Sequence, residues 1–285
     1  MIRFILLILI ALTSSNADDR AIEKCASSVV QIHIKHSTGE SVGSGIILDT
    51  SGYIITNEHV IENADVITIT LPNSYIKHTA NLIGSDKDTD IALIKIDSKN
   101  LHPASIAKLL PTRGEKILTV GYPFHNHQSI SRGIVSAVHV YGVDNVKYES
   151  YIEIDANVNH GNSGGALCNA KGELIGMNSA SFKGFGFSIE IDKVLSIINV
   201  LKIKGKFQRN KLGISVEDSM SCKGTAVINV NKNSNSFKNG DCIIGLNNIQ
   251  IDSAASLFHI LGFYERGTEL SFSIIRDEAE LVILK

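Results

Sequence analysis

Short apolar runs rich in isoleucine and valine, each bounded by turn residues, constrain the fold of this chain most strongly. One run, Tyr53-Ile54-Ile55, follows the turn sequence Asp49-Thr50-Ser51-Gly52, and another begins at Ile91. Glycine, asparagine, aspartate and serine favour turns, and short apolar runs between closely spaced turns are typical of strands in all-β domains. The sequence therefore predicts a mainly β fold, and its 285 residues suffice for two domains.

The balance of charges argues against a nucleic-acid partner. Lysine and arginine total 27, and aspartate and glutamate total 29, for a formal net charge of −2. The lysines alternate with acidic residues, and the sequence contains no basic stripe of the kind that follows a phosphate backbone. We therefore expect neither DNA nor RNA as a ligand.

The segment Gly161-Asn162-Ser163-Gly164-Gly165 carries the clearest chemical signal. Glycines permit a sharp turn that exposes the Ser163 hydroxyl, and they let neighbouring backbone N–H groups point at one spot. Convergent N–H groups of this kind stabilise a developing oxyanion. By itself, however, the string fits an ordinary glycine-rich loop equally well.

Two upstream residues supply the partners that a nucleophilic serine needs. His59 lies just after the predicted strand 53–55, where the core meets solvent, and Asp90 directly precedes the apolar run from Ile91. A buried carboxylate is costly unless it is hydrogen-bonded, and an imidazole N–H meets that need. Either residue alone is more often a packing histidine or a turn-capping aspartate, but the three contexts together predict a catalytic triad.

The order of these residues along the chain, histidine, aspartate and serine, matches the chymotrypsin-like arrangement. Ser163 is predicted to attack a carbonyl, His59 to take and return the proton, and Asp90 to orient the imidazole and stabilise the imidazolium. In that arrangement the oxyanion hole consists of the N–H groups of Ser163 and of the residue two before it, Gly161.

Several motifs resemble those of the HtrA/Deg family of serine proteases. They lie at residues 56–60, 90–93, 131–137, 161–167, 172–178 and 184–189. The resemblance runs from Val29 to the C-terminus, and it implies two six-stranded β-barrels with the catalytic groups in the cleft between them. It also implies endopeptidase activity on unfolded or misfolded envelope proteins, without a metal or an organic cofactor.

The N-terminus predicts an export signal. Arg3 precedes an apolar run, residues 4–12, that is too short to span a bilayer, and Ser15-Asn16-Ala17 places small residues at the −3 and −1 positions of a cleavage site. We expect residues 1–17 to be removed as a signal peptide. The protease domain, 18–202, would then be exported to the periplasm without a stable membrane span. An uncleaved anchor is the alternative.

The composition changes at residues 203–210, which are polar and basic and are predicted to form a linker. Beyond them, Lys211-Leu212-Gly213-Ile214 resembles the carboxylate-binding loop of a PDZ domain, which is expected at 211–285. A peptide would pair with the strand edge at 214–216, and backbone N–H groups of the loop would hold its C-terminal carboxylate. The run 254–261 would be the helix that closes the groove.

Three departures from the family pattern bear on regulation and assembly. The family usually has an arginine that takes part in an activation contact where this chain reads Val138-His139-Val140, and the loop between Ser181 and Gly184 is short. Family trimers rely on aromatic residues near the mature N-terminus, yet no phenylalanine or tyrosine lies between Ala17 and Tyr53. A homotrimer is therefore left open.

We interpret the cysteines, His160 and the pair His125 and His127 as residues without a catalytic or metal-binding role. Four cysteines in an exported chain permit three disulfide pairings, but Cys242 lies in an apolar run, and we expect free thiols. His160 is interpreted as a loop residue beside the serine turn. His125 and His127 have no third ligand at a suitable spacing, so no metal site is expected.

The specificity pocket is expected between segments 157–160 and 178–182. Neither segment contains an acid that would receive a basic substrate side chain. The resemblance implies small aliphatic side chains at the residue whose carbonyl is attacked.

Together these features predict an exported, ATP-independent serine endopeptidase with one PDZ domain that binds C-terminal peptides. The resemblance implies a role in protein quality control and the stress response. The alternative is a peptide-binding or chaperone-like protein with little or gated proteolytic activity, because the loops around Ser163 are short and the activation arginine is missing.

Overall fold

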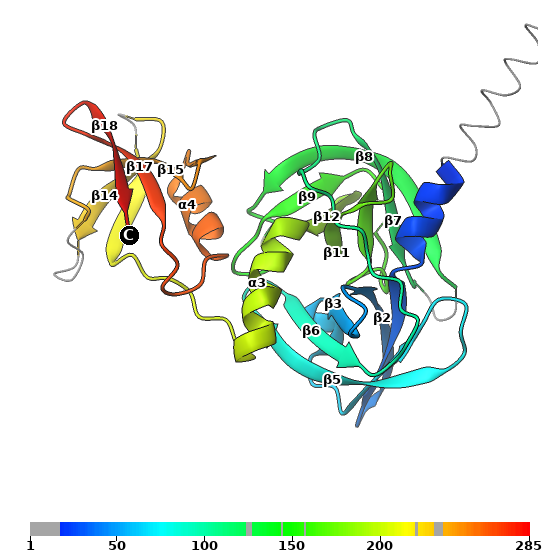
Figure 1. Cartoon of the computed structure of the whole chain (residues 1–285). Helices are drawn as coiled ribbons and strands as arrows, with labels where there is room; N and C mark the ends of the chain where they lie inside the picture. Colours follow the sequence, from blue (N-terminus) through cyan, green and yellow to red (C-terminus); the bar gives the residue numbers. More distant parts are fainter. Residues whose placement is uncertain (1–17, 124–126, 144, 157, 220–221, 231–235) are drawn as a thin grey trace, which may run out of the picture. The chain divides into compact units, whose positions relative to one another are not determined.

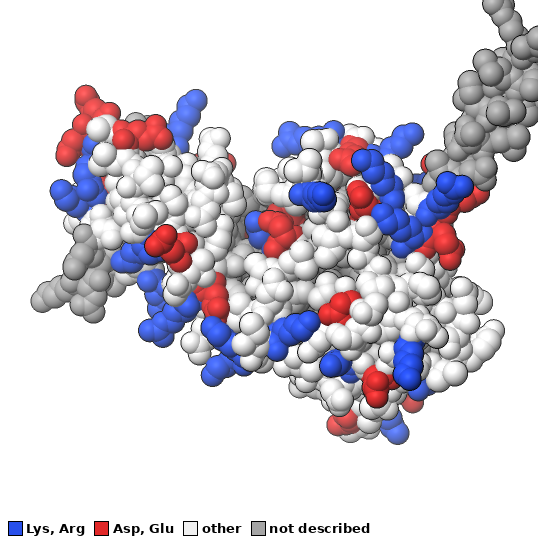
Figure 2. Space-filling model, viewed as in Figure 1, with Lys and Arg blue, Asp and Glu red and all other residues white. Residues whose placement is uncertain are grey.

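The structure is a computed structural model that describes residues 18–123, 127–143, 145–156, 158–219, 222–230 and 236–285 (Figure 1). Two compact units divide at residues 206 and 207, and the short segment Lys147–Glu149 groups with the second unit. On the face shown in Figure 2, cationic and anionic side chains are interspersed over both units.

The first unit begins with a closed β-barrel whose strands are linked in the order β1-β2-β3-β6-β5-β4, with β4 pairing back to β1. Its strands are β1 (Val29–His36), β2 (Gly39–Ile47), β3 (Tyr53–Thr56), β4 (Val66–Thr70), β5 (Lys77–Asp86) and β6 (Ile91–Ile96). Branched side chains such as Ile32, Ile54 and Ile94 are fully buried inside it. Isoleucine packs well on a pleated surface, which explains why these short runs form strands.

A second closed barrel follows, with the strand order β10-β11-β12-β9-β8-β7 and with β7 pairing back to β10. Its strands are β7 (Lys116–Gly121), β8 (Ser129–Val140), β9 (Tyr151–Ile154), β10 (Ala166–Asn169), β11 (Leu174–Phe182) and β12 (Phe185–Glu190). The two six-stranded barrels implied by the family resemblance are thereby confirmed.

Helix α3 (Ile191–Lys204) packs against β5 and β6 of the first barrel and against β11 and β12 of the second (Figure 1). Val194, Ile197 and Leu201 recur at helical spacing and are buried. The helix ends at Gly205, whose φ of 69° lies in the left-handed region that favours glycine. It thus continues through Lys204, two residues into the segment predicted as a linker.

Both pairs of cysteines form disulfides, so the expectation of free thiols is wrong. Cys25, in the helical residues 18–26, is bonded to Cys168 on β10, and Cys222 is bonded to Cys242. Cys25 and Cys168 are each 1% exposed. Burial and disulfide bonding are therefore compatible. The partners Cys25 and Cys168, 143 residues apart, leave no local signal in the sequence.

The second unit carries one sheet in the order β13-β14-β15-β17-β18, with β16 also paired to β15. Its elements are β13 (Ile214–Asp218), β14 (Thr225–Val230), β15 (Cys242–Leu246), β16 (Ile249–Gln250), α4 (Ala254–Leu261), β17 (Ser271–Arg276) and β18 (Ala279–Leu284). The helix predicted at 254–261 is α4, and Ser253 and Ser256 form a capping box at its start.

No helix among the described residues is long and apolar enough to cross a membrane. The predicted signal peptide, residues 1–17, lies outside the described residues.

Candidate active site

The structure brings His59 and Asp90 into direct contact. His59 lies in the short helix α2 (Glu58–Ile61) after β3, and Asp90 precedes β6. The Nδ1 atom of His59 is 2.9 Å from each carboxylate oxygen of Asp90, and the His59 backbone N–H donates to Oδ1 at 3.0 Å. With Nδ1 directed at the carboxylate, the second ring nitrogen is the one available for proton transfer.

Asp90 is held in place from several sides. Its side chain is 4% exposed, and its φ of 59° places a non-glycine residue in the left-handed region. The Asn57 side-chain amide donates to the Asp90 carbonyl at 3.0 Å, and the Ser179 hydroxyl donates to Oδ2 at 3.0 Å. The Asn57 bond fixes the backbone of Asp90, and the Ser179 bond fixes the orientation of the carboxylate and, through it, that of the imidazole of His59.

Electrostatics favour a protonated His59. Burial of the ring acts to lower its pKa, but the hydrogen bond and charge of Asp90, followed by the charges of Glu58 and Glu62, outweigh burial and raise the pKa above its ordinary value. The pKa of Glu58 is itself raised by burial and by the charge of Glu62. As the pH falls, His59 therefore becomes protonated and stops acting as a base at a higher pH than an isolated histidine would.

The turn around Ser163 requires glycine on both sides. Gly161 has a φ of 93° and Gly164 a φ of 80°. A Cβ atom on Gly161 would lie 2.7 Å from the Tyr122 carbonyl oxygen, and one on Gly164 would collide with the carbonyl of Ser44. Side chains at these positions would displace the turn, so the sequence motif has a direct steric reason.

Ser44, on β2 of the first barrel, fixes the serine turn, which belongs to the second barrel. Its backbone N–H donates to the Ser163 carbonyl at 3.0 Å, and its hydroxyl donates to the Gly161 carbonyl at 2.7 Å. Thr56 in turn donates to the Ser44 carbonyl. Sequence reasoning missed Ser44. The available signal was its glycine neighbours, because glycine inside a strand often marks a close backbone approach.

Ser179, on β11, connects the nucleophile candidate to the acid. The Ser163 hydroxyl donates to the Ser179 carbonyl at 3.1 Å, while the Ser179 hydroxyl donates to Asp90. Among the described residues, the Ser163 hydroxyl makes its hydrogen bond to this carbonyl and not to the ring of His59. Sequence reasoning placed Ser179 only in a pocket segment and did not predict this bridge.

The predicted oxyanion donors are the unused N–H groups of the turn. The N–H groups of Asn162, Gly164 and Gly165 donate to backbone carbonyls at 2.8–2.9 Å. Within the described part of the chain, the N–H groups of Gly161 and Ser163 have no such acceptor. They are therefore available to a substrate oxygen.

The walls predicted for the specificity pocket are only partly described. Asn157 lies outside the described residues, and His160 is an exposed turn residue. On the other side, β11 and β12 join through a two-residue turn in which Lys183 and Gly184 have φ values of 51° and 87°. Positive φ at both positions is typical of a tight hairpin, so the loop is short and regular.

The stretch 138–140, which lacks the family's arginine, holds a second histidine–carboxylate pair. His139 Nδ1 is 2.8 Å from Oε1 of Glu190, whose side chain is fully buried, and Ser150 donates to Oε2 at 2.7 Å. The hydrogen bond to Glu190 raises the pKa of His139. Burial acts to raise the pKa of Glu190, but the hydrogen bond and charge of His139 outweigh burial and lower it.

In the second unit, the predicted peptide-binding loop leads into β13, which stands at one end of the described sheet order. Lys211 is exposed and Leu212 is buried, and Gly213 has a φ of 71° before Ile214 begins the strand. On α4, Leu257 is buried in the core of this unit and the neighbouring Leu261 is partly buried against the same core.

Among the described residues, no group of three or more histidine, cysteine or acidic side chains is arranged to hold a metal. His125, one of the two histidines considered for a metal pair, lies outside those residues.

Two family models match the chain, and they divide it as the structure does. Residues 43–177 match a trypsin-like peptidase domain, and residues 210–283 match a PDZ domain. The first span contains His59, Asp90 and Ser163. The second contains the loop before β13.

Named relatives match over most of this chain. It is 35% identical to a serine endoprotease DegS of Haemophilus influenzae, over 83% of this chain and 74% of that protein. It is 36% identical to a probable periplasmic serine endoprotease, DegP-like, of Pseudomonas savastanoi, over 84% of this chain but only 54% of that protein.

Solved structures agree in fold. The HtrA-type protease AlgW with tripeptide has a TM-score of 0.77 at 28% identity, covering 94% of this chain and 97% of that chain. A serine endoprotease from Yersinia pestis has a TM-score of 0.67 at 31% identity, covering 93% and 95% of the two chains. This chain therefore belongs to the HtrA/Deg family of serine endoproteases, with a trypsin-like peptidase domain and one PDZ domain.

Proposed function

We propose that the chain is an exported serine endopeptidase in which Ser163 is the nucleophile, His59 the general base and acid, and Asp90 the residue that orients His59. One observation carries this assignment. The buried Asp90 carboxylate accepts hydrogen bonds from the backbone and the ring of His59, and Ser179 links that carboxylate to Ser163. Support for export comes from the relatives named as periplasmic.

The chemistry follows from these positions. The Ser163 hydroxyl turns from the Ser179 carbonyl to the free ring nitrogen of His59, gives up its proton and attacks the substrate carbonyl. The N–H groups of Gly161 and Ser163 stabilise the resulting oxyanion. His59 then protonates the leaving amine, and a water molecule repeats the sequence to release the acyl group.

The proposed substrates are unfolded or misfolded proteins of the cell envelope. An extended, unfolded segment can enter an active site that a compact domain cannot. The PDZ domain would bind free C-termini by adding a strand to β13, with the N–H groups of Leu212 and Gly213 at the carboxylate. The proposed role is protein quality control, and a homotrimer is one assembly compatible with it.

A second candidate function is a peptide-binding, chaperone-like protein with gated proteolysis. The observation that favours it is the hydrogen bond from the Ser163 hydroxyl to the Ser179 carbonyl, which directs the hydroxyl away from the base. The two functions differ in one rotation of the Ser163 side chain. Activation would then consist of shifting the population of that rotamer.

Hydrolysis of unfolded casein by the mature chain tests the proposal. We expect cleavage that increases from pH 6 to pH 9 as His59 loses its proton, and none in Ser163→Ala. A control, Ser150→Ala, removes a serine hydroxyl outside the proposed triad and should cleave casein normally. Casein left intact by the wild-type chain over this pH range would favour the chaperone-like function.

The PDZ assignment has its own test. A peptide with a free C-terminal carboxylate should bind the full chain, and the same peptide ending in an amide should not. Equal binding of both peptides would contradict carboxylate capture by residues 211–214.

A further inference from the structure

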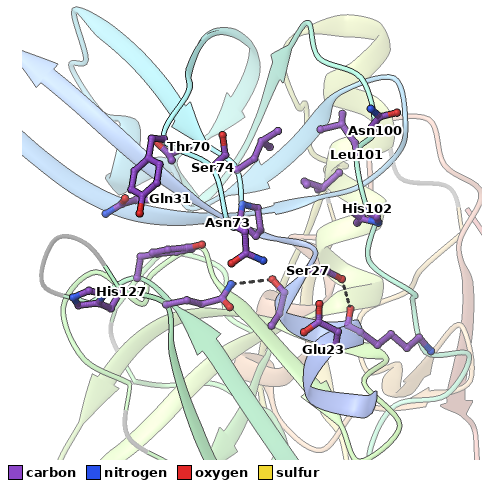
Figure 3. Close-up of a pocket in the computed structure, with 18 of the residues that line it drawn as sticks. Glu23, Ser27, Gln31, Thr70, Asn73, Ser74, Asn100, Leu101, His102 and His127 are labelled. Carbon is purple, nitrogen blue, oxygen red and sulfur yellow. Dashed lines mark hydrogen bonds between the residues drawn. The ribbon is translucent and has the colours of Figure 1, made fainter. Parts of the chain in front are cut away.

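An open cavity of about 1420 Å³ lies in the first unit, and none of the proposed triad residues lines it. Figure 3 shows Glu23 and Ser27 on one side of it, Thr70 and Ser74 on another, and Asn73 projecting between them. The walls come from the helical residues 18–26, from β1, from the β4–β5 connection, and from loops after β6 and before β8.

The charged side chains that line this cavity are mostly cationic. Four are basic and one, Glu23, is acidic. The basic residues are Arg20, Lys24, Lys77 and Lys99. Within the described part of the chain, none of the four forms an ion pair within 4.0 Å. Unpaired cations that face one hollow from different segments create a positive potential there.

The cations converge from three directions. Arg20 and Lys24 are four residues apart and therefore share a face of the helix at 18–26. Lys77 begins β5 directly opposite Thr70 of β4, and Lys99 follows β6. Asn73 and Asn100 add side-chain amides that can donate hydrogen bonds.

A histidine that lines the cavity is affected by one of these cations. His33, on β1, has its Nε2 atom 3.0 Å from the Thr70 hydroxyl. Its pKa is lowered by burial and then by the charge of Lys77, with Glu40 acting in the opposite direction. The charge of Lys77 therefore reaches a second lining residue.

We propose that this cavity binds an anion carrying several phosphate groups. Lysine ammonium groups are compact point charges that bind phosphate well. An extended peptide is the less suitable occupant, because β1 is already paired on both sides and offers no strand edge. The volume also exceeds that of a drug-sized pocket, about 300–1,000 Å³, and it leaves room for more than one phosphate.

Calorimetric titration of the mature full-length chain with tripolyphosphate tests the proposal. Lys77→Ala/Lys99→Ala should weaken binding about tenfold, because each exposed cation contributes a few-fold at moderate salt. The matched control, Lys116→Ala/Lys171→Ala, removes two exposed lysines outside the cavity and should change binding less than about twofold. Thermal unfolding of both variants checks that they fold.

Two further measurements identify the source of the phosphate and its position. Sedimentation with vesicles that contain cardiolipin, a lipid with two phosphate groups, against phosphatidylcholine vesicles asks whether a lipid headgroup is bound. If tripolyphosphate binds and the vesicles do not, the ligand is a soluble anion. In NMR titrations, saturation with tripolyphosphate should raise the pKa of His33, because the anion offsets the charge of Lys77.

The proposal is overturned if neither tripolyphosphate nor cardiolipin binds at millimolar concentration. It is also overturned if the two double variants lose affinity equally, since binding would then follow overall charge and not the cavity. These outcomes are independent of casein cleavage, so the phosphate site and the peptidase can fail separately.

Discussion

Two histidine–carboxylate pairs in the same unit are built almost identically. Asp90 accepts the ring and backbone N–H groups of His59 and a hydroxyl from Ser179. Glu190 has the corresponding contacts with His139 and Ser150. Both carboxylates are at least 96% buried, and both histidine side chains are 48% exposed. Burial, hydrogen bonding and exposure therefore do not distinguish the two pairs.

What distinguishes them is the serine. The carbonyl of Ser179 accepts the hydroxyl of Ser163, which sits between glycines on a constrained turn. The carbonyl of Ser150 accepts the backbone N–H of Glu190, so the hydrogen bonds of Ser150 both lead back to Glu190 and not to another serine. A buried carboxylate can orient a histidine anywhere in a fold. Chemistry requires in addition a nucleophile and donors for the oxyanion. Among the described residues, it is the Asp90 pair that is linked to the turn for which we propose both roles.

The largest expected contrast is in catalysis. Asp90→Asn should lower kcat about 10⁴-fold, because the amide favours the wrong imidazole tautomer. Glu190→Gln should change kcat by no more than a few-fold. Steady-state hydrolysis of a peptide substrate measures both. Comparable losses in the two variants would erase the functional distinction between the pairs.

For the His139–Glu190 pair we expect an effect on folding stability. His139→Ala removes a charge-assisted hydrogen bond from the buried Glu190 and should cost about 1–2 kcal/mol, at the low end because the imidazole is half exposed. Folding raises the His139 pKa, so its stabilisation is complete below the unfolded-state value of about 6.5. It is lost as the pH rises through the folded-state pKa.

Urea denaturation at several pH values measures this effect. The free-energy difference between wild type and His139→Ala should be largest near pH 6 and should shrink at pH 9. A difference that grows with pH would contradict the assigned ion pair.

A smaller effect is expected at the bridging serine. Ser179→Ala deletes one hydrogen bond to the Asp90 carboxylate and should lower kcat about tenfold, since a hydrogen bond to a charged group contributes about 1.5–3 kcal/mol in favourable cases. Ser150→Ala removes the matching bond to Glu190 and should leave kcat unchanged. Single-turnover kinetics of the two variants, at one pH, compares them directly.

The smallest expected effect concerns the pH profile. The raised His59 pKa places the acid limb of kcat/KM above the ordinary histidine value of about 6.5. Glu62→Gln removes one of the charges that raise it, so the limb should move to lower pH. An inflection that moves upward in Glu62→Gln would show that the limb reports another group.

The sequence predicted those parts whose signals are local. Apolar runs predicted the strand before His59 and the burial of Asp90, and glycine at 161 and 164 predicted the serine turn. The helix at 254–261 was predicted from the resemblance to a PDZ domain. Contacts between distant segments were missed. Ser44 acts on a turn more than a hundred residues later, and Glu190 pairs with a histidine that sequence reasoning noted only as part of the stretch 138–140.

The same limit explains the cysteines. Nothing near Cys25 indicates a partner on β10, because the closure of the second barrel and the position of the helix at 18–26 bring them together. Spacing in the sequence does not encode that proximity.

The central claim is that only the Asp90 pair serves a nucleophile. The most direct test is the rate of fluorophosphonate labelling of the full chain, with mass spectrometry locating the modified residue. The account predicts a label on Ser163 alone, labelling slowed at least about a thousandfold in Asp90→Asn, and a wild-type rate in Glu190→Gln. Equal slowing in both variants, or a label on any other serine, would contradict it.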